Sequence, residues 1–271
     1  MSHSLAVIGV GNMAKAILAG IRNSSFPVKE IFVFDTNKSQ YQDLPTNGIS
    51  LFYADSVADA VSNADCILLS VKPQNFPDLL QEIRAVPTYA DKLYVSIAAG
   101  IPSGQISAQL GNACVIRVLP NVPMLIGNGV SLVCKTPNAS VEDFDWICSM
   151  FRCAGNVICI DEQDMNPMIG VTSSSPAYVF QFINAIYQGA LNQQLPDNNL
   201  LEAICDVVIG SAMLLKSSSD SPQELITKVA SKGGTTERAL AVLEEHGFDH
   251  IILDAMLACT NRADELGAQN S

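Results

Sequence analysis

The segment Gly9–Ala14 has the residue types and spacing that bind a dinucleotide. It reads Gly-Val-Gly-Asn-Met-Ala, directly after an apolar run and directly before a helix-compatible stretch. The glycines allow a tight turn and the close approach of a pyrophosphate, which then meets free N–H groups at a helix N-terminus. The alternative is a tight turn that binds nothing. The predicted cofactor residues here are Ile8, Gly9, Val10, Gly11, Asn12 and Met13.

Asp35 and the three residues after it bear on which nucleotide the site takes. Asp35 ends the next β-rich run and lies 24 residues beyond Gly11. An acid at this place usually accepts hydrogen bonds from the adenosine ribose and disfavours a 2′-phosphate, which favours NADH. Thr36, Asn37 and Lys38 offer a hydroxyl, an amide and a cation, which suit the phosphate of NADPH instead. Both interpretations stay open on these residues, and the alternative for Lys38 is a solvated loop lysine.

Three loops that follow later β-rich runs supply the remaining residues of the predicted cofactor site. In open α/β sheets the ligand lies over the carboxyl ends of the strands. Asn121 lies between two prolines in the third loop, and its amide is suited to hold a nicotinamide or a substrate. The alternative for Asn121 is a plain turn, where Asn is common. The predicted cofactor residues of the first two loops are Ser70, Val71, Lys72, Pro73, Ala98 and Ala99.

Two hydroxyl-rich segments in the second half of the chain are suited to bind an anion. Thr172–Tyr178 places a hydroxyl cluster that includes Ser174 at the start of a helix, where a carboxylate is favoured. Ser231–Glu237 is a second glycine-rich turn that opens a helix, and consecutive free N–H groups form a small anion-binding nest. The alternative for both segments is helix capping alone, because Ser and Thr are favoured caps.

The elements that position these residues in the first half alternate between strands and helices. Most of the β-rich runs are continuously apolar, which is typical of strands covered on both faces. The alternation predicts a parallel, doubly wound α/β sheet. The predicted strands are Leu5–Val10, Ile31–Asp35, Ile49–Tyr53, Cys66–Val71, Leu93–Ala99, Val115–Leu119, Val130–Cys134 and Val157–Ile160. The predicted helices between them are Met13–Asn23, Ser56–Ser62, Pro77–Ala85, Ile101–Leu110 and Val141–Phe151.

After about residue 162 the sequence predicts helices only. Gly247 is expected to end one helix and Asp249 to cap the next. Several of the helices are apolar on more than one face, which favours an intertwined homodimer over a bundle packed on its own α/β domain. We therefore expect two domains, residues 1–162 and 163–271. The predicted helices are Pro176–Gln193, Asn198–Ser217, Pro222–Ala230, Thr235–His246 and His250–Leu266.

Composition excludes several classes of protein. The 271 residues are 48% hydrophobic, which is ample for packed cores and argues against a disordered chain. The net charge is −12, with 15 Lys and Arg against 27 Asp and Glu, so a basic face for nucleic acid or anionic membranes is not expected. We expect no signal peptide, no membrane span and no metal site. The eight cysteines form no CxxC pair and are predicted to be reduced core thiols of a cytoplasmic protein.

These motifs together give the chain a clear resemblance to the pyrroline-5-carboxylate reductases, over essentially its whole length. The most specific block is the Gly-Gly-Thr-Thr turn, since other Rossmann reductases do not place one there. The matching segments are Gly9–Ala14, Val71–Pro73, Ser96–Gly100, Arg117–Pro123, Ser174–Phe180, Ser231–Thr236 and Ala239–Phe248. The chain departs from the family pattern at Ser173, where Gly is usual, at Lys232, where Pro is usual, and at Val122, where Thr is usual.

The resemblance implies a fold and a reaction. The family has a Rossmann domain followed by a helical dimerisation domain, and its dimers often form a decamer. It reduces the cyclic imine Δ1-pyrroline-5-carboxylate to L-proline with NADPH or NADH, the last step of proline biosynthesis. We expect NADPH here, with NADH as the alternative. By similarity, Thr236 is assigned to the ring nitrogen. The expected substrate-binding residues are Asn121, Ser174, Ser231, Gly233, Gly234 and Thr235.

Two other functions stay open at this point. One is a non-catalytic NADP-binding sensor or scaffold, and the other is a reductase of another cyclic imine. A β-hydroxyacid dehydrogenase is disfavoured, because the lysine-bearing helix motif of that class is absent from the sequence. Hydride transfer to a protonated imine needs mainly correct placement of the two rings, so the scarcity of histidines is compatible with the reductase.

Overall fold

The computed structural model describes residues 3–44, 48 and 50–269, and the chain forms two compact units. The first unit is discontinuous and comprises the chain up to Ser174 and again from Met256 onward. The second unit is Ser175–Ala255. This division by contacts differs from the predicted boundary between residues 162 and 163. The reason is that Met165, Ile169 and Ala263 join an apolar cluster with strand residues of the sheet.

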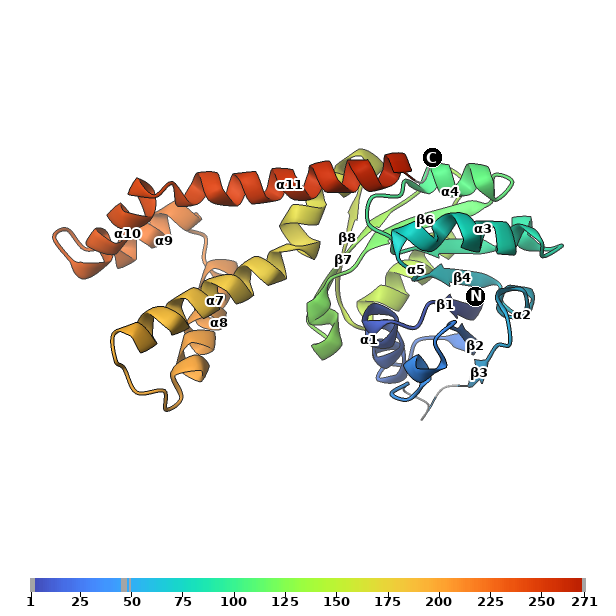
Figure 1. Cartoon of the computed structure of the whole chain (residues 1–271), viewed down its shortest axis with the longest axis horizontal. Helices are drawn as coiled ribbons and strands as arrows, with labels where there is room; N and C mark the ends of the chain where they lie inside the picture. The colour runs from blue at the N-terminus through green and yellow to red at the C-terminus, as the bar shows by residue number, and fades with distance from the viewer. Residues whose placement is uncertain (1–2, 45–47, 49, 270–271) are drawn as a thin grey trace. The chain divides into compact units, whose positions relative to one another are not determined.

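The first unit is built on one eight-stranded sheet, as the alternation of runs predicts (Figure 1). Its spatial order is β3-β2-β1-β4-β5-β6-β7-β8, with the reversal after β1 that defines a doubly wound sheet. Each predicted strand is present within a few residues of its predicted bounds. The strands are β1 (His3–Ile8), β2 (Val28–Phe34), β3 (Leu51–Tyr53), β4 (Cys66–Leu69), β5 (Leu93–Ser96), β6 (Cys114–Leu119), β7 (Gly129–Cys134) and β8 (Gly155–Ile160).

The sheet is not wholly parallel, which corrects one detail of the prediction. Strands β6 and β7 pair antiparallel, with Arg117 opposite Cys134, whereas the other neighbouring strands pair parallel. Residues 120–128 between β6 and β7 are too few for a crossover, which needs a dozen residues or more. The short connection therefore makes the chain reverse direction.

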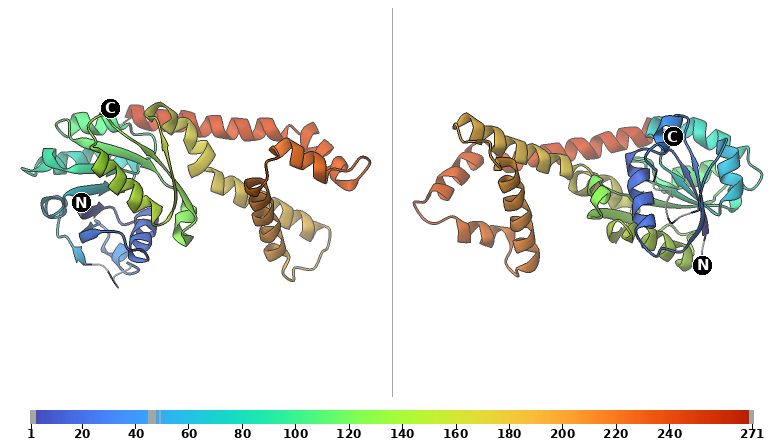
Figure 2. Two further views of the ribbon diagram at one scale, coloured as in Figure 1. Left: turned by 180° about the vertical axis from the view of Figure 1, so that it is seen from behind. Right: turned by 90° about the horizontal axis from the view of Figure 1, so that it is seen from below.

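Helices cover both faces of this sheet (Figure 2). Alternate residues of β1 divide between the faces, so Leu5 and Val7 join one core and Ala6 and Ile8 the other. The first core takes side chains from α1 (Asn12–Arg22) and α5 (Val141–Arg152). The second takes them from α2 (Val57–Asn63), α3 (Phe76–Arg84) and α4 (Ser103–Gln109). Two covered faces explain why most of the strands are apolar at successive positions.

The second unit is entirely helical, as predicted. It holds α7 (Ser175–Asn192), α8 (Leu200–Ser217), α9 (Pro222–Val229), α10 (Thr235–Glu245) and the start of α11 (Phe248–Gln269). The sequence analysis missed a short helix, α6 (Met165–Met168), and the π-helical turn Ile169–Ser173, both in the first unit. Within the described residues, no helix has the length and apolar composition needed to span a bilayer.

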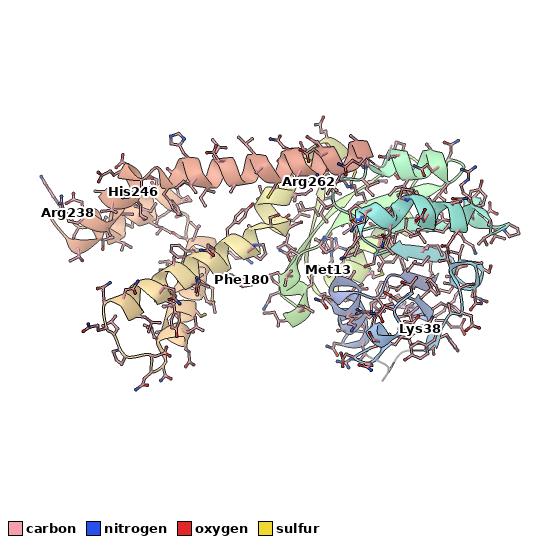
Figure 3. The ribbon with its side chains drawn as sticks, viewed as in Figure 1. Met13, Lys38, Phe180, Arg238, His246 and Arg262 are labelled. Carbon is pink, nitrogen blue, oxygen red and sulfur yellow. The ribbon has the colours of Figure 1, made fainter. Side chains whose placement is uncertain are left out.

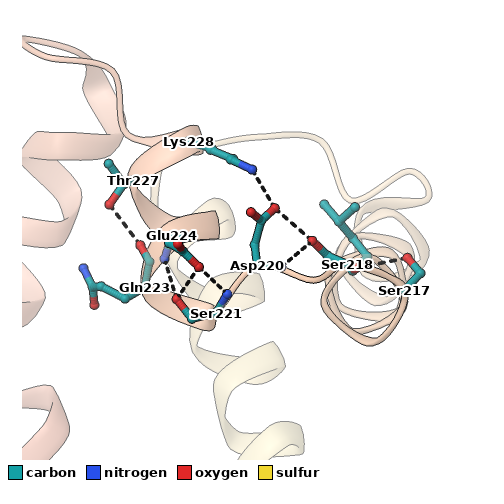
Figure 4. Close-up of polar contacts among 9 residues, drawn as sticks. Ser217, Ser218, Asp220, Ser221, Gln223, Glu224, Thr227 and Lys228 are labelled. Atoms are coloured by element: carbon teal, nitrogen blue, oxygen red, sulfur yellow. Dashed lines mark hydrogen bonds and ion pairs between the residues drawn. The ribbon is translucent and has the colours of Figure 1, made fainter.

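Local capping explains where several of these helices begin. The hydroxyl of Ser221 accepts from the Glu224 N–H, and the Glu224 carboxylate accepts from the Ser221 N–H at 2.7 Å, a complete capping box for α9 (Figure 4). Gly247 ends α10 with φ +67°, as predicted. The predicted cap at Asp249 is wrong, because α11 already begins at Phe248 and the Ile251 N–H donates to the Gly247 carbonyl.

Many large apolar side chains of the second unit are exposed. Phe180 on α7 is 61% exposed, and Val207 and Met213 on α8 are each 66% exposed (Figure 3). A hollow of about 450 Å³ lies between α7 and α8. Its lining consists of Phe182, Ile186, Ala203, Ile204, Val207, Val208 and Ser211. Apolar surface of this extent on one unit is typical of a face that another protein surface covers.

The described residues contain no disulfide, and three of the eight cysteines lie in the core as predicted. Cys66, Cys134 and Cys148 are buried. Burial raises the pKa of the Cys134 and Cys148 thiols to about 12, so both are protonated and unreactive at neutral pH. Cys159 is exposed, which corrects its assignment to the core. It lies on β8, the edge strand of the sheet, where only one neighbouring strand covers it.

Candidate cofactor and substrate sites

The loop between β1 and α1 uses its first two glycines for different purposes. Gly9 has φ +90°, and a Cβ there would lie 2.7 Å from the Ser70 carbonyl oxygen. Packing against the β4 loop therefore requires this glycine. Gly11 precedes the first turn of α1 as its N-cap, and a Cβ there would meet nothing within 4 Å. Its backbone faces open space, which leaves room for a phosphate at the N-terminus of α1.

Asp35 ties the end of β2 to this loop. One carboxylate oxygen accepts from the Val10 N–H at 2.7 Å, and the other accepts from the Asn37 N–H at 2.8 Å. Both hydrogen bonds come from the backbone, so the carboxylate is held in place. Asp35 therefore has a structural role in the glycine loop beside any contact with a nucleotide.

A cavity of about 580 Å³ opens at the carboxyl ends of β1, β2 and β4. This is the place where open α/β sheets bind ligands. Nine of the predicted cofactor residues line it, namely Ile8, Gly9, Gly11, Asp35, Thr36, Asn37, Ser70, Val71 and Lys72. The sequence analysis missed the other lining residues, which are Phe34, Gln40, Val57, Asn75, Asp78, Leu79 and Glu82.

The missed residues of α3 carried a signal in the sequence. Asp78 and Glu82 are four residues apart and Leu79 lies beside them, so all three occur on one helical face. Only the packing of α3 on the sheet shows that this face borders the cavity. Two carboxylates thus join Asp35 around a cavity whose single lining cation, among the described residues, is Lys72.

Lys38 does not line this cavity. Its ammonium lies 4.9 Å from the centre of the Phe34 ring and 5.1 Å from that of Tyr41, and it donates to the Tyr41 hydroxyl at 3.2 Å. Figure 3 labels it on the segment that follows β2. Cation–π attraction of this kind is worth about 0.5–1 kcal/mol at an exposed site. The predicted contact of Lys38 with a cofactor stays a prediction.

The remaining predicted cofactor residues lie outside the lining of the large cavity. Val10 and Ala98 have buried side chains, so they could reach a cofactor through the backbone alone. Asn12 and Met13 open α1, and Pro73 begins a short 3₁₀ turn. Ala99 lines a second hollow of about 330 Å³ in the same unit. The other residues of this hollow are Ile169, Ser174, Ala258, Cys259, Arg262, Ala263 and Leu266.

Asn121 braces two segments of backbone in the first unit. Its amide nitrogen donates to the Thr172 carbonyl at 3.0 Å, and its amide oxygen accepts from the Val130 N–H at 2.8 Å. The side chain is buried, with both ends of the amide in use. Its geometry thus supports a structural role, and contact with a nicotinamide or substrate stays a prediction.

The hydroxyl cluster before α7 is also partly used by the fold. The Thr172 hydroxyl donates to the Met168 carbonyl at 3.1 Å, and the Ser173 hydroxyl donates to the Pro120 carbonyl at 3.4 Å. Ser174 follows the π-helical turn and borders the second hollow. Among the predicted substrate residues, Ser174 and Asn121 therefore belong to the first unit.

The second glycine-rich turn forms a nest in the second unit, as predicted. Gly233 has φ +75°, Gly234 is the N-cap of α10, and Thr235 and Thr236 form its first turn. Helical geometry leaves the first N–H groups of such a turn without partners in the helix. The Gly233 N–H donates to the Glu237 carboxylate at 2.6 Å. This hydrogen bond caps the start of α10 from within the chain, and binding of a ligand anion at this turn stays a prediction.

Gly234 is also required by close packing inside the nest. Its N–H donates to the Ser231 carbonyl at 2.9 Å. A Cβ at this position would lie 2.6 Å from the Ser231 hydroxyl oxygen. Lys232 is exposed at the tip of the turn. A cation there adds to the attraction of the turn for an anion.

A buried ionic network that the sequence analysis did not identify supports the first unit. Arg117 on β6 is 1% exposed and donates to Glu162 at 2.9 Å and to Asn166 at 2.6 Å. Burial alone would raise the pKa of Glu162, but hydrogen bonds from Ser103 and Arg117 together hold that pKa below its usual value. Asn166 donates in turn to Asp264 on α11. The network joins β6 to α4, α6 and the last turns of α11.

Comparison with known proteins settles the family. A family model described as pyrroline-5-carboxylate reductase dimerisation matches residues 162–266, and one described as NADP oxidoreductase, coenzyme F420-dependent, matches residues 4–100. The pyrroline-5-carboxylate reductase of Escherichia coli (strain K12) is 36% identical over 271 residues, covering 98% of this chain and 99% of that protein. The chain belongs to the pyrroline-5-carboxylate reductase family. It is an oxidoreductase that acts on pyrroline-5-carboxylate.

Relatives and solved structures of this family match over nearly the full length. The pyrroline-5-carboxylate reductase of Pisum sativum is 31% identical, covering 98% of this chain and 96% of that protein. The crystal structure of Plasmodium falciparum pyrroline carboxylate reductase, with NADP bound, has a TM-score of 0.88 at 26% identity, covering 98% of each chain. The Streptococcus pyogenes enzyme has a TM-score of 0.87 at 27% identity, covering 97% of this chain and 99% of the other.

Proposed function

We propose that this chain transfers a hydride from NADPH to the imine carbon of Δ1-pyrroline-5-carboxylate, which becomes C5 of L-proline, and releases L-proline, the last step of proline biosynthesis. The observation that carries the proposal is the cavity around Gly9 and Gly11 at the carboxyl ends of β1, β2 and β4. The structure of the Plasmodium falciparum relative with NADP bound supports the same cofactor here. NADH is the alternative hydride donor.

The residues around the cavity suit a dinucleotide. The open backbone at Gly11 accepts the pyrophosphate at the N-terminus of α1. Thr36 and Asn37 offer donors beside the ribose, and Lys72 supplies a cation at the same cavity. When bound, the nucleotide supplies the hydride. The chain's own task is to bind and orient the two reactants.

The imine needs little acid–base help if it binds protonated. Hydride addition to the C=N carbon of the iminium leaves a neutral ring amine, which then takes a proton from water. The positions of the three histidines agree with a reaction that needs little acid–base catalysis. His3 lies at the opposite end of β1 from the glycine loop and pairs with Asp143 at 3.3 Å. His246 and His250 lie at the junction of α10 and α11.

The nest before α10 is proposed to bind the substrate carboxylate. The positive end of the α10 dipole favours an anion, and a substrate carboxylate would take the place of the Glu237 carboxylate, which accepts from the Gly233 N–H at 2.6 Å. Ser231, Gly233, Gly234 and Thr235 are assigned to the carboxylate. Thr236 is assigned to the ring nitrogen, by similarity to the family. Asn121 and Ser174 are kept as further candidates for substrate contact.

The functional unit is proposed to be a homodimer formed through residues 163–271. The match of residues 162–266 to a dimerisation model and the exposed apolar side chains of α7 and α8 support this assembly. A decamer of such dimers is proposed on family resemblance alone. We also place the enzyme in the cytoplasm, which the buried unbonded thiols of Cys66, Cys134 and Cys148 support.

One assay tests the proposed reaction. Purified protein is mixed with NADPH and pyrroline-5-carboxylate, and nucleotide oxidation is measured together with the amount of L-proline formed. Equal amounts of the two products support the proposal. Nucleotide binding without turnover would favour a sensor or scaffold. Turnover with other cyclic imines but not with pyrroline-5-carboxylate would favour a reductase of a different substrate.

A further inference from the structure

Glu237 engages a donor of the nest that is proposed to bind the substrate carboxylate. The Gly233 N–H donates to the Glu237 carboxylate at 2.6 Å, and the Gly234 N–H donates to the Ser231 carbonyl at 2.9 Å. Both N–H groups belong to residues that are assigned to the substrate carboxylate. One donor is thus engaged by a neutral oxygen and the other by a negatively charged one. A substrate that takes the Gly233 N–H has to displace Glu237 first.

The Glu237 contact differs from an ordinary capping box, and α9 in the same unit shows the difference (Figure 4). In α9, Glu224 accepts from the N–H of its N-cap residue, Ser221, at 2.7 Å, and the Ser221 hydroxyl accepts from the Glu224 N–H in return. In α10 the N-cap is Gly234, which has no side chain to return such a bond. The Glu237 carboxylate reaches one residue further, to Gly233, whose φ is +75°. It therefore lies against the glycine turn itself.

The charge of Glu237 also opposes a second carboxylate at this turn. Its side chain is exposed, and among residues 3–44, 48 and 50–269 it forms no ion pair. Lys232 is exposed at the tip of the turn and does not pair with it. Two carboxylates that share one site repel each other. Glu237 thus weakens the binding of a substrate carboxylate in two ways, because it occupies a donor and because it is negatively charged.

We propose that Glu237 is an internal competitor for the substrate carboxylate and thereby sets the KM of the enzyme for pyrroline-5-carboxylate. In the empty enzyme its carboxylate accepts from the Gly233 N–H, and when the substrate binds it turns out to solvent, which its exposed position allows. The inference rests on the proposed function, and it adds the residue that limits substrate affinity. Glu237 takes no part in hydride transfer, so its effect is confined to ligands that carry the carboxylate.

The test compares the steady-state kinetics of full-length Glu237→Gln and wild type at saturating NADPH. Gln keeps an acceptor for the Gly233 N–H but loses the charge. The KM for pyrroline-5-carboxylate is expected to fall about tenfold, the effect of removing one like charge in a wet site, while kcat changes less than threefold. The inhibition constant of L-proline, which carries the same carboxylate, is expected to fall by a similar factor. The KM for 1-pyrroline, the same ring without the carboxylate, is expected to stay within threefold of wild type.

Two further variants keep the test specific. Glu237→Ala removes the acceptor as well as the charge, and its KM for pyrroline-5-carboxylate is expected to fall at least as far. Glu224→Gln removes the same charge from the start of α9, and its KM and kcat are expected to change less than threefold. The inference is overturned if neither Glu237 variant lowers this KM, if the KM for 1-pyrroline falls equally, or if Glu224→Gln lowers the KM as much. If the wild-type protein reduces neither imine, the proposed function itself fails, and the inference fails with it.

Discussion

Gly9 and Gly11 stand two residues apart in the same loop, yet they should respond in opposite ways to an added side chain. At Gly11 a Cβ meets nothing within 4 Å and the backbone has an ordinary φ of −76°, so Gly11→Val leaves the empty protein nearly as stable as wild type. The expected loss is about 1 kcal/mol or less, because valine is a poorer N-cap than glycine. The isopropyl group instead fills the space that a pyrophosphate needs.

The expected loss of nucleotide binding at Gly11 is large. Displacing the pyrophosphate removes two or more hydrogen bonds to a charged group, each worth about 1.5–3 kcal/mol. Losing two therefore costs about 3–6 kcal/mol, which is roughly a 10²–10⁴-fold rise in Kd for NADPH. Fluorescence titration with NADPH measures this change, and thermal unfolding without nucleotide shows that the fold is intact.

Gly9→Ala should have the opposite effect, because the added methyl group destabilises the folded protein. Its Cβ would lie 2.7 Å from the Ser70 carbonyl oxygen, and φ is +90°. Overpacking costs about 1–3 kcal/mol and the left-handed backbone about 1–2 kcal/mol more. Gly104→Val on α4 is the matched control, since a Cβ there also meets nothing within 4 Å. The reasoning is refuted if Gly11→Val binds NADPH with wild-type affinity, or if it unfolds more easily than Gly9→Ala.

Four further predictions concern the nest, the buried network and the dimer. Thr236→Val should lower kcat/KM for pyrroline-5-carboxylate by about one to two decades and leave the Kd for NADPH unchanged. The control variant is Thr227→Val on α9, which should change neither quantity. Arg117→Met should cost roughly 3 kcal/mol in chemical unfolding, the lower end for a broken buried pair because the Glu162 side chain is 35% exposed. The pKa of Glu162 is lower in the folded protein than its unfolded value of about 4.5, so ionised Glu162 stabilises the fold at pH values above 4.5. This stabilisation is lost as the pH falls through the folded pKa. Glu162→Gln should therefore make the free energy of unfolding depend less on pH in the acid range. Val207→Glu should shift light scattering toward smaller species, and an unchanged mass would place the interface elsewhere.

Sequence patterns that extend over only a few residues predict much of the fold. The eight strands and the main helices follow from apolar runs and from breakers between them, and the doubly wound sheet follows from their alternation. The glycine loop was predictable as well, because its conformation depends on residues adjacent in the chain. The errors at local scale are small. Asp249 lies inside α11 rather than before it, since Gly247 alone suffices to end α10.

The partners of individual side chains could not be read from the sequence. Lys38 was expected at a phosphate and lies over two aromatic rings, and Asn121 was expected at a ligand and braces two loops. Arg117 carried no signal beyond its apolar neighbours, yet it holds Glu162 and Asn166 from distant parts of the chain. The contacts of Arg117 and the Asn121–Thr172 hydrogen bond join residues tens of positions apart, so they exist only once the layers have packed.

The sequence by itself thus determined which segments become strands and helices, and where the glycine-rich turns before α1 and α10 lie. Each of these depends on backbone geometry and on side chains within one or two helical turns. The tertiary structure alone decided that α3 brings Asp78 and Glu82 to the same cavity as Asp35, and that Glu162 and Asn166 meet Arg117. The carboxylates around the cavity come from segments that are distant in the chain, and only the packing of α3 on the sheet brings them together.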